Sequence, residues 1–151
     1  LFLANEADEI DIVFPYKLFL SGAKKQAFDK MDQFLKLIGK SKVIKVIIES
    51  GIYRATSEIT EICHFLTKQP IHFIKTSTGK IENGASIKAA KLILNTIADN
   101  NIGLKVSGGI KNIEQANQYL RLAENHFNNG AKLSPKQFRI GASQLVNQIL
   151  K

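Results

Sequence analysis

Short apolar runs of strand-like character alternate with runs of helical period along the chain. β-Branched and aromatic residues predict strands at residues 9–14, 43–49, 71–75, 102–106 and 138–140. Between the strands, apolar residues recur every three or four positions, which predicts helices that begin near residues 21–22, 57, 86, 112 and 141. These are five strand–helix units without a linker or a low-complexity tract, so we expect one α/β domain over residues 1–151.

Helix-start signals support two of the predicted helices. Ser86 precedes an apolar periodic stretch, as an N-cap residue does. Asn112 is followed three residues later by Gln115, a spacing that resembles a capping box. Pro70 interrupts the chain between the second helix and the third strand.

Strand–helix units in series imply a parallel sheet, either open and doubly wound or part of a TIM (β/α)8 barrel. In the second strand, Ile44, Val46 and Ile48 share one face, whereas Lys45 and Glu49 share the other. Charged residues at matching positions of the other strands are Asp11, Lys75, Lys105 and Arg139. A doubly wound sheet would be apolar on both faces, so the alternation favours a barrel with a charged interior.

The length of the chain limits how much of a barrel it can form. A complete (β/α)8 barrel has about 250 residues and eight strands, whereas this chain has 151 residues and five predicted strands. We therefore expect an incomplete barrel with five of the eight β/α units and two open sheet edges. A missing N-terminal segment, a partner chain or a second copy of the chain could complete it, or the piece could have decayed. The start at Leu1 favours a fragment of a longer protein.

The charge of the chain favours anionic partners. Lysine and arginine number 21 against 13 acidic residues, a formal charge of +8. The basic residues are spread out, and three tyrosines with no tryptophan offer few rings for base stacking, so nucleic acid is a minor alternative. Phosphorylated metabolites are the favoured partners.

The cysteine and the histidines narrow the chemistry further. Cys63 stands alone, which excludes an internal disulfide, fits a reducing cytoplasm and, on an apolar helix face, indicates a core residue. His64, His72 and His126 lack metal-ligand spacing, so no metal site is expected. Residues 1–4 are apolar but lack a basic flank, and we expect neither a signal peptide nor a membrane span.

Two lysines at strand ends are the strongest candidates for chemistry. Lys75 and Lys105 each close an apolar run and are followed by a glycine-containing loop. In a barrel they would converge with Asp11 and Lys45, and mutual repulsion would lower the pKa of at least one lysine, leaving a nucleophilic amine. The carboxylate could move protons. For Lys45, an ion pair with Asp11 or Glu49 is as good an interpretation as a catalytic role.

Glycines after the last three strands suit a bound anion. Gly79, Gly108 and Gly109 allow backbone N–H groups to approach an anion closely, and residues 141–143 open a further helix. Barrel enzymes commonly hold phosphate on the loops after their last two strands.

Five short motifs appear in a characteristic order and spacing: residues 8–16 (DEIDIVFPY), 45–49 (KVIIE), 73–80 (FIKTSTGK), 105–110 (KVSGGI) and 139–143 (RIGAS). Together they resemble the deoxyribose-phosphate aldolase family, and the resemblance runs through essentially the whole chain. It implies a class I aldolase without metal or cofactor. The reaction would be reversible cleavage of 2-deoxy-D-ribose 5-phosphate to acetaldehyde and D-glyceraldehyde 3-phosphate.

The resemblance also implies roles for individual residues. Lys75 would form the Schiff base, Lys105 would keep that amine deprotonated and assist proton transfer, and Asp11 would work with a water as general acid and base. The phosphate of the sugar would rest on Gly79, Lys80, Gly108, Gly109, Lys111, Gly141 and Ser143.

Two departures from the family pattern occur near the end of the sequence. Gln144 follows Ser143 where several family members have a second serine, and the sequence ends at Lys151 without the C-terminal tyrosine of those members. We expect both to weaken phosphate affinity and proton transfer. A different class I aldolase and an inactive sugar-phosphate-binding remnant remain alternative hypotheses.

Overall fold

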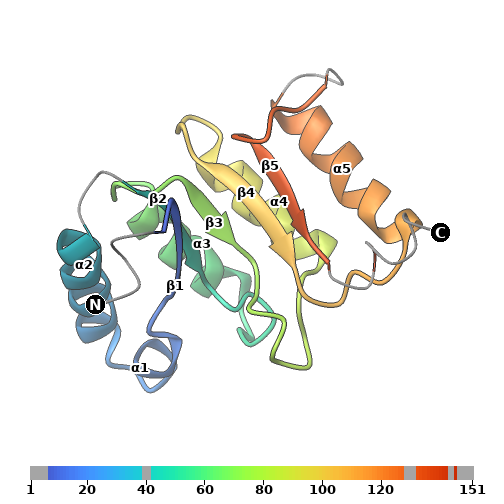
Figure 1. Cartoon of the computed structure of the whole chain (residues 1–151). Coiled ribbons are helices and arrows are strands. Elements are labelled where there is room, and N and C mark those ends of the chain that lie inside the picture. Colours follow the sequence, from blue (N-terminus) through green and yellow to red (C-terminus); the bar gives the residue numbers. More distant parts are fainter. Residues whose placement is uncertain (1–6, 39–41, 128–131, 143–144, 146–151) are drawn as a thin grey trace.

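A computed structural model describes residues 7–38, 42–127, 132–142 and 145 of the chain. They contain one sheet of five parallel strands in the order β1-β2-β3-β4-β5 (Figure 1). The strands are β1 (Glu9–Val13), β2 (Val43–Ile47), β3 (Phe73–Lys75), β4 (Gly103–Ser107) and β5 (Phe138–Gly141). All five predicted strands are confirmed.

Within the described ranges 7–38, 42–127 and 132–142, five helices connect or follow the strands: α1 (Tyr16–Leu20), α2 (Lys24–Ile38), α3 (Thr56–Leu66), α4 (Ile87–Ile97) and α5 (Ile113–Phe127). The Ser86 cap is confirmed, because its Oγ accepts a hydrogen bond from the Ala89 N–H at 3.1 Å. Asn112 caps α5, because its Oδ1 accepts from the Gln115 N–H. In a capping box the Gln115 side chain would accept from the Asn112 N–H, but here it accepts from the N–H of the preceding residue, Lys111. Gly141, predicted to open the last helix, is instead the last residue of β5, and the remainder of that predicted helix falls mainly outside the described residues.

The short helix α1 was not predicted from the sequence. It has five residues, fewer than two turns, so it carries no apolar period to detect. It forms because Phe19 is buried against the rings of Phe14 and Phe28, with centroids 5.9 and 5.7 Å away. This contact is made between elements rather than within α1.

The two faces of the sheet differ as the alternation predicts. Side chains of β2 to β4 that are fully buried on the apolar face belong to Ile44, Val46, Ile74, Leu104 and Val106. Their apolar cluster includes residues of α2 to α5, and Figure 1 shows α3 and α4 behind the sheet. The opposite face holds the charged residues, so the helices leave it free for chemistry.

The sheet curls strongly enough to bring its outer strands together. Arg139 on β5 donates to Glu9 on β1, with Nη1 2.8 Å from Oε2. A flat sheet would separate these strands by four spacings of about 4.8 Å, beyond the reach of the two side chains. The curl and the order of the strands identify five units of a TIM (β/α)8 barrel, with the charged face as its interior.

Candidate functional site

Strand register places the candidate side chains next to one another on the charged face. Asp11 pairs with Lys45 between β1 and β2, and Lys75 pairs with Lys105 between β3 and β4. Between β2 and β3 the register pairs Ile47 with Lys75, so the Lys75–Lys105 pair lies two residues further along the strands than the Asp11–Lys45 pair, on the same face of the sheet.

The Asp11 carboxylate lies at the centre of the cluster. Its Oδ1 accepts from Lys45 Nζ at 2.7 Å, its Oδ2 accepts from Lys75 Nζ at 2.7 Å, and Lys105 Nζ is 3.9 Å from Oδ2. One carboxylate is therefore shared by three lysines. The structure brings together all four residues that strand parity placed in the barrel interior.

Lys45 is the most deeply buried of the three lysines, with 4% of its surface exposed. Besides Asp11 it contacts Glu9, with Nζ 2.9 Å from Oε2. The predicted ion pair with Asp11 is confirmed, whereas the alternative partner Glu49 is wrong because its carboxylate is bonded to the loop after β3. Two acidic partners compensate the buried ammonium of Lys45.

The surroundings shift the pKa values of Asp11 and Lys105 in ways that bear on proton transfer. Partial burial raises the pKa of Asp11, but hydrogen bonds from Lys45 and Lys75 outweigh it and leave the pKa below its usual value. Desolvation lowers the pKa of Lys105, Asp11 opposes this, and the charges of Lys75, Lys45 and Arg139 lower it further. Lys105 therefore has the lowered pKa that was expected of one lysine, but desolvation contributes more to it than the repulsion between lysines that was predicted.

Glu9 and Arg139 form a second charged layer that supports the cluster; strand parity placed Arg139 on this face, but neither residue was given a role from the sequence. Glu9 accepts from Arg139 and contacts Lys45, and these cations hold the pKa of Glu9 below its usual value. The guanidinium of Arg139 also lies over the Phe73 ring, 4.5 Å from its centroid. The position of Glu9 two residues before Asp11, on the same strand face, is the sequence signal that could have identified it.

A cavity of about 470 Å³ opens beside Lys75 and Lys105. The predicted phosphate-binding residues that line it are Gly79, Gly108, Gly109, Lys111 and Gly141. Thr78 and Ser107 also line it and were not predicted. Amines, glycine loops and a cationic side chain are thus gathered around one space.

Two predicted phosphate-binding residues are not placed in this lining. Lys80 lies outside it, and its backbone N–H donates to Thr78 Oγ1 at 3.1 Å, which stabilises the turn. Ser143 falls outside the described residues, so the structure does not place it.

A buried polar network fixes the loop that follows β3. Glu49 has 1% of its surface exposed, and its carboxylate accepts from Ser77 Oγ at 2.9 Å and from Thr78 N–H at 3.0 Å. Ser77 Oγ in turn accepts from Gly79 N–H at 3.0 Å. From the sequence, Glu49 is expected only as a possible ion partner of Lys45, and its function as an anchor is missed.

Hydrogen bonds also join the loops after β3 and β4. Thr76 Oγ1 donates to Ser107 O and accepts from Ser107 N–H, both at 2.9 Å, and Ser107 Oγ donates to Ser77 O. The two loops that line the cavity are therefore tied to each other as well as to β2 through Glu49.

Close backbone packing positions loop 80–85 against Gly108. Ala85 N–H donates to Gly108 O at 2.9 Å, and a Cβ on Gly84 would lie 2.4 Å from that oxygen. Gly108 itself has a φ of +89°, a conformation that favours glycine. Only glycines allow this approach of the two segments.

Replacing Gly84 by alanine is expected to push loop 80–85 away from Gly108 and to lower the free energy of unfolding by about 2 kcal/mol. Chemical denaturation measures the loss. Gly22→Ala is the control, because its φ of +89° is strained but no atom lies within 4 Å of its Cβ position, so only about 1 kcal/mol of backbone strain is expected. Equal losses in the two variants would show that close packing at Gly84 is unimportant.

Several structural observations limit the chemistry of the described residues. In ranges 7–38, 42–127 and 132–142, no group of three or more histidine, cysteine, aspartate or glutamate residues could hold a metal ion. Cys63 is a buried core residue, as predicted, and burial raises the pKa of its thiol to about 12. No helix in the described part of the chain is long and apolar enough to cross a bilayer.

Comparison with known proteins places the chain in a family. Residues 1–150 match the family model described as DeoC/LacD family aldolase. A structure provisionally described as a deoxyribose-phosphate aldolase from Coccidioides immitis shares 26% identity, with a TM-score of 0.76, and the match covers 97% of this chain and 54% of that one.

Two further structures share the fold at lower identity. One, provisionally described as the same enzyme from Toxoplasma gondii, has a TM-score of 0.83 at 17% identity, covering 98% of this chain and 60% of that one. The tetrameric deoxyribose phosphate aldolase from Aeropyrum pernix has a TM-score of 0.68 at 22% identity, covering 93% and 53%. This chain spans little more than half the length of these structures, and it belongs to the DeoC/LacD family of aldolases.

Proposed function

We propose that the protein is an aldolase of the deoxyribose-phosphate type that acts through a Schiff base on Lys75. The observation that carries the proposal is the shared Asp11 carboxylate, with Lys75 at 2.7 Å and Lys105 at 3.9 Å beside a cavity lined by glycine loops. The family match supports aldolase chemistry in general. The substrate and the residue roles are our proposals.

In the proposed reaction, the Lys75 amine attacks the C1 aldehyde of open-chain 2-deoxyribose 5-phosphate, and water leaves to give an iminium ion. Loss of the C3 hydroxyl proton breaks the C2–C3 bond, releases glyceraldehyde 3-phosphate and leaves an enamine on Lys75. Protonation at C2 and hydrolysis then release acetaldehyde. The iminium serves as the electron sink, so the scheme needs no cofactor.

Neighbouring groups supply the proton transfers that this scheme requires. Lys105, with a pKa below its usual value, can accept the proton that Lys75 must lose before it attacks. Asp11 is ionised and hydrogen-bonded to Lys75, so it can move protons through a water to and from the substrate. Lys45, already held by Asp11 and Glu9, has a structural role in this proposal.

The substrate phosphate would bind at the far end of the same cavity. Lys111 supplies a positive charge there, and the backbone at Gly79, Gly108 and Gly109 can approach an anion closely. We include Gly141, Ser143 and Lys80 on family resemblance. A small phosphorylated sugar is therefore the proposed partner, and the isolated, buried Cys63 is compatible with a cytoplasmic location.

Reductive trapping tests the proposed nucleophile. Acetaldehyde with borohydride is expected to place one stable ethyl group on Lys75, located by peptide mass mapping, and Lys75→Leu should remove it. Lys68→Leu, at an exposed helix-end lysine, is the control and should be labelled like the wild type. Absence of a Lys75 adduct in folded protein, or labelling no faster than at surface lysines, would defeat the proposal.

The alternative is an inactive remnant that binds a sugar phosphate, and it is suggested by the match to the Coccidioides protein, which covers only 54% of that protein's chain. It predicts that 2-deoxyribose 5-phosphate raises the melting temperature without release of acetaldehyde. Turnover by the protein would exclude the remnant, and preference for another phosphosugar would indicate a different class I aldolase. Native mass spectrometry shows whether a second copy or another chain completes the barrel.

A further inference from the structure

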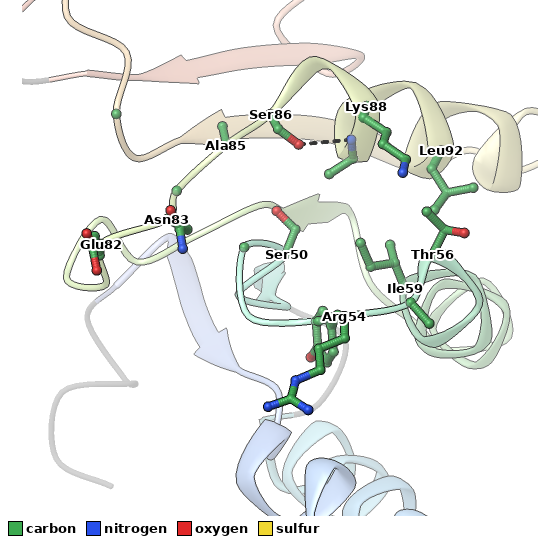
Figure 2. Close-up of a pocket in the computed structure, with 16 residues that line it drawn as sticks. Ser50, Arg54, Thr56, Ile59, Glu82, Asn83, Ala85, Ser86, Lys88 and Leu92 are labelled. Carbon is green, nitrogen blue, oxygen red and sulfur yellow. Dashed lines mark hydrogen bonds between the residues drawn. The ribbon is translucent and has the colours of Figure 1, made fainter.

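A second cavity lies between the N-terminal ends of α3 and α4 (Figure 2). Its volume is about 440 Å³, similar to that of the cavity beside Lys75. Residues 78 and 79 of the β3–α4 connection line the first cavity, and residues 82–86 line the second. Gly109 lines both, so the two spaces adjoin without sharing the lysine cluster.

Ser50 provides an unsatisfied polar group in this second cavity. The residue has 4% of its surface exposed, and its backbone N–H is fixed by a 2.7 Å hydrogen bond to Thr76 O. Among the residues that the structure describes, Ser50 Oγ is the only buried side-chain polar atom without a hydrogen-bond partner. Such groups are rare in folded proteins, and a ligand that supplies a partner relieves the cost of burying one.

The polar part of the lining favours a negative charge. Arg54 and Lys88 contribute two cations against one acidic residue, Glu82. Ile87 and Lys88 are the first residues of α4. A helical N–H bonds the carbonyl four residues earlier, and for these two residues that carbonyl lies before the helix, so their N–H groups have no intrahelical acceptor. At the start of α3, by contrast, Glu58 already accepts from the N–H groups of Arg54 and Ala55.

The remaining wall is apolar and well ordered by packing. Ile59 and Ala89 are each 5% exposed, and Leu92 completes this side of the cavity. Figure 2 shows Ser50 between the segment that carries Arg54 and the helix start that carries Ser86 and Lys88. In the same view the Arg54 side chain points away from Ser50, so it adds positive charge at the rim of the cavity, whereas Lys88 and the start of α4 lie beside the apolar wall.

We propose that this cavity is a second ligand site, which binds a small organic anion. The acidic group of the ligand lies near Lys88 and the start of α4, where it accepts from Ser50. Arg54 adds positive charge at the rim, and the apolar part of the ligand packs on Ile59, Ala89 and Leu92. The site is independent of the proposed Schiff-base chemistry, which uses none of these side chains.

Benzoate, with benzamide as its neutral counterpart of the same shape, is the probe that tests this proposal. In protein with ¹³C-labelled isoleucine and leucine methyl groups, benzoate is expected to shift the Ile59 and Leu92 resonances saturably, and benzamide at least tenfold more weakly. The variant Arg54→Gln with Lys88→Gln should lose at least tenfold in benzoate affinity. Lys91→Gln, on the same helix but outside the lining, should retain it.

Ser50→Ala separates ligand binding from a structural role. Its hydroxyl has no partner in the protein alone, so the variant should be at least as stable as the wild type yet bind benzoate more weakly. The proposal is overturned if benzoate leaves both methyl groups unshifted, if benzamide binds equally well, or if the Arg54 and Lys88 replacements leave the affinity unchanged. Lys75→Leu should not alter benzoate affinity, which distinguishes this site from the first cavity.

Discussion

Asp11→Asn is expected to lower turnover by about 10²- to 10⁴-fold, the usual contribution of a positioned general acid or base, while leaving trapping at Lys75 intact. The two effects separate because Asp11 favours the protonated form of Lys105. Without that carboxylate the pKa of Lys105 falls further, so more amine is free to accept a proton from Lys75. Turnover is measured by the release of acetaldehyde. Trapping is measured in the same preparation as the amount of Lys75 that acetaldehyde and borohydride convert to the ethyl adduct.

The same replacement is expected to reduce the free energy of unfolding at neutral pH by about 2 kcal/mol, because three lysines lose their shared counter-charge. Despite partial burial, hydrogen bonds from Lys45 and Lys75 hold the folded-state pKa of Asp11 below its usual value of 3.8. The contribution of Asp11 to stability is therefore fully present above that usual value and is lost as the pH falls through the lower folded value. The stability gap between wild type and variant should therefore close in acid.

Asp29→Asn is the matched control for Asp11. Asp29 lies on α2 and is paired with Lys25 four residues away, both largely exposed, so its removal should cost less than about 0.5 kcal/mol. A gap between wild type and Asp11→Asn that stays constant down to acid pH would contradict an electrostatic role. Loss of trapping together with turnover would assign Asp11 to formation of the Schiff base instead.

Glu49→Ala is expected to lower the free energy of unfolding by about 3 kcal/mol, because Ser77 Oγ and Thr78 N–H lose their buried acceptor. The loop that carries Gly79 should then loosen. We expect the KM for 2-deoxyribose 5-phosphate to rise at least tenfold, with a smaller change in the rate of Lys75 trapping by acetaldehyde, which has no phosphate. Denaturation and steady-state kinetics measure the two effects.

The backbone of Glu49 provides an internal control. Its φ of 54° lies in the left-handed region, where a residue with a Cβ is strained by about 1 kcal/mol. Glu49→Gly removes the same carboxylate but also this strain, so it should be at least as stable as Glu49→Ala, the reverse of the usual order. If the alanine variant were the more stable of the two, strain at this position would be unimportant.

Local signals predicted the elements that local forces determine. The strands β1 to β5 were recognised from β-branched runs, and the start of α4 was recognised from Ser86, whose oxygen bonds an N–H three residues later. Helix α1 was missed because it is stabilised by ring packing of Phe19 with Phe14 and Phe28, residues outside the helix. Its sequence contains too few turns to show a period.

The residues of the candidate site also fall into those that the sequence predicted and those that it did not. Asp11, Lys75 and Lys105 were predicted because side-chain direction in a strand follows from parity alone. Glu49 was misjudged because its left-handed backbone turns the carboxylate toward Ser77, 28 residues away, instead of toward Lys45. Ser50 gave no sequence signal, because an unpartnered hydroxyl is a property of its surroundings.

The sequence by itself determined the order of five β/α units, the separation of an apolar and a charged sheet face, and the presence of Lys75 and Lys105 on the charged face. The tertiary structure decided which charges meet. The bond between Arg139 and Glu9 joins residues 130 positions apart, and Asp11 reaches Lys75 across β2. These contacts depend on register and curl, which arise only when the strands pair, because the twist of each strand and the stagger between neighbours accumulate across the sheet.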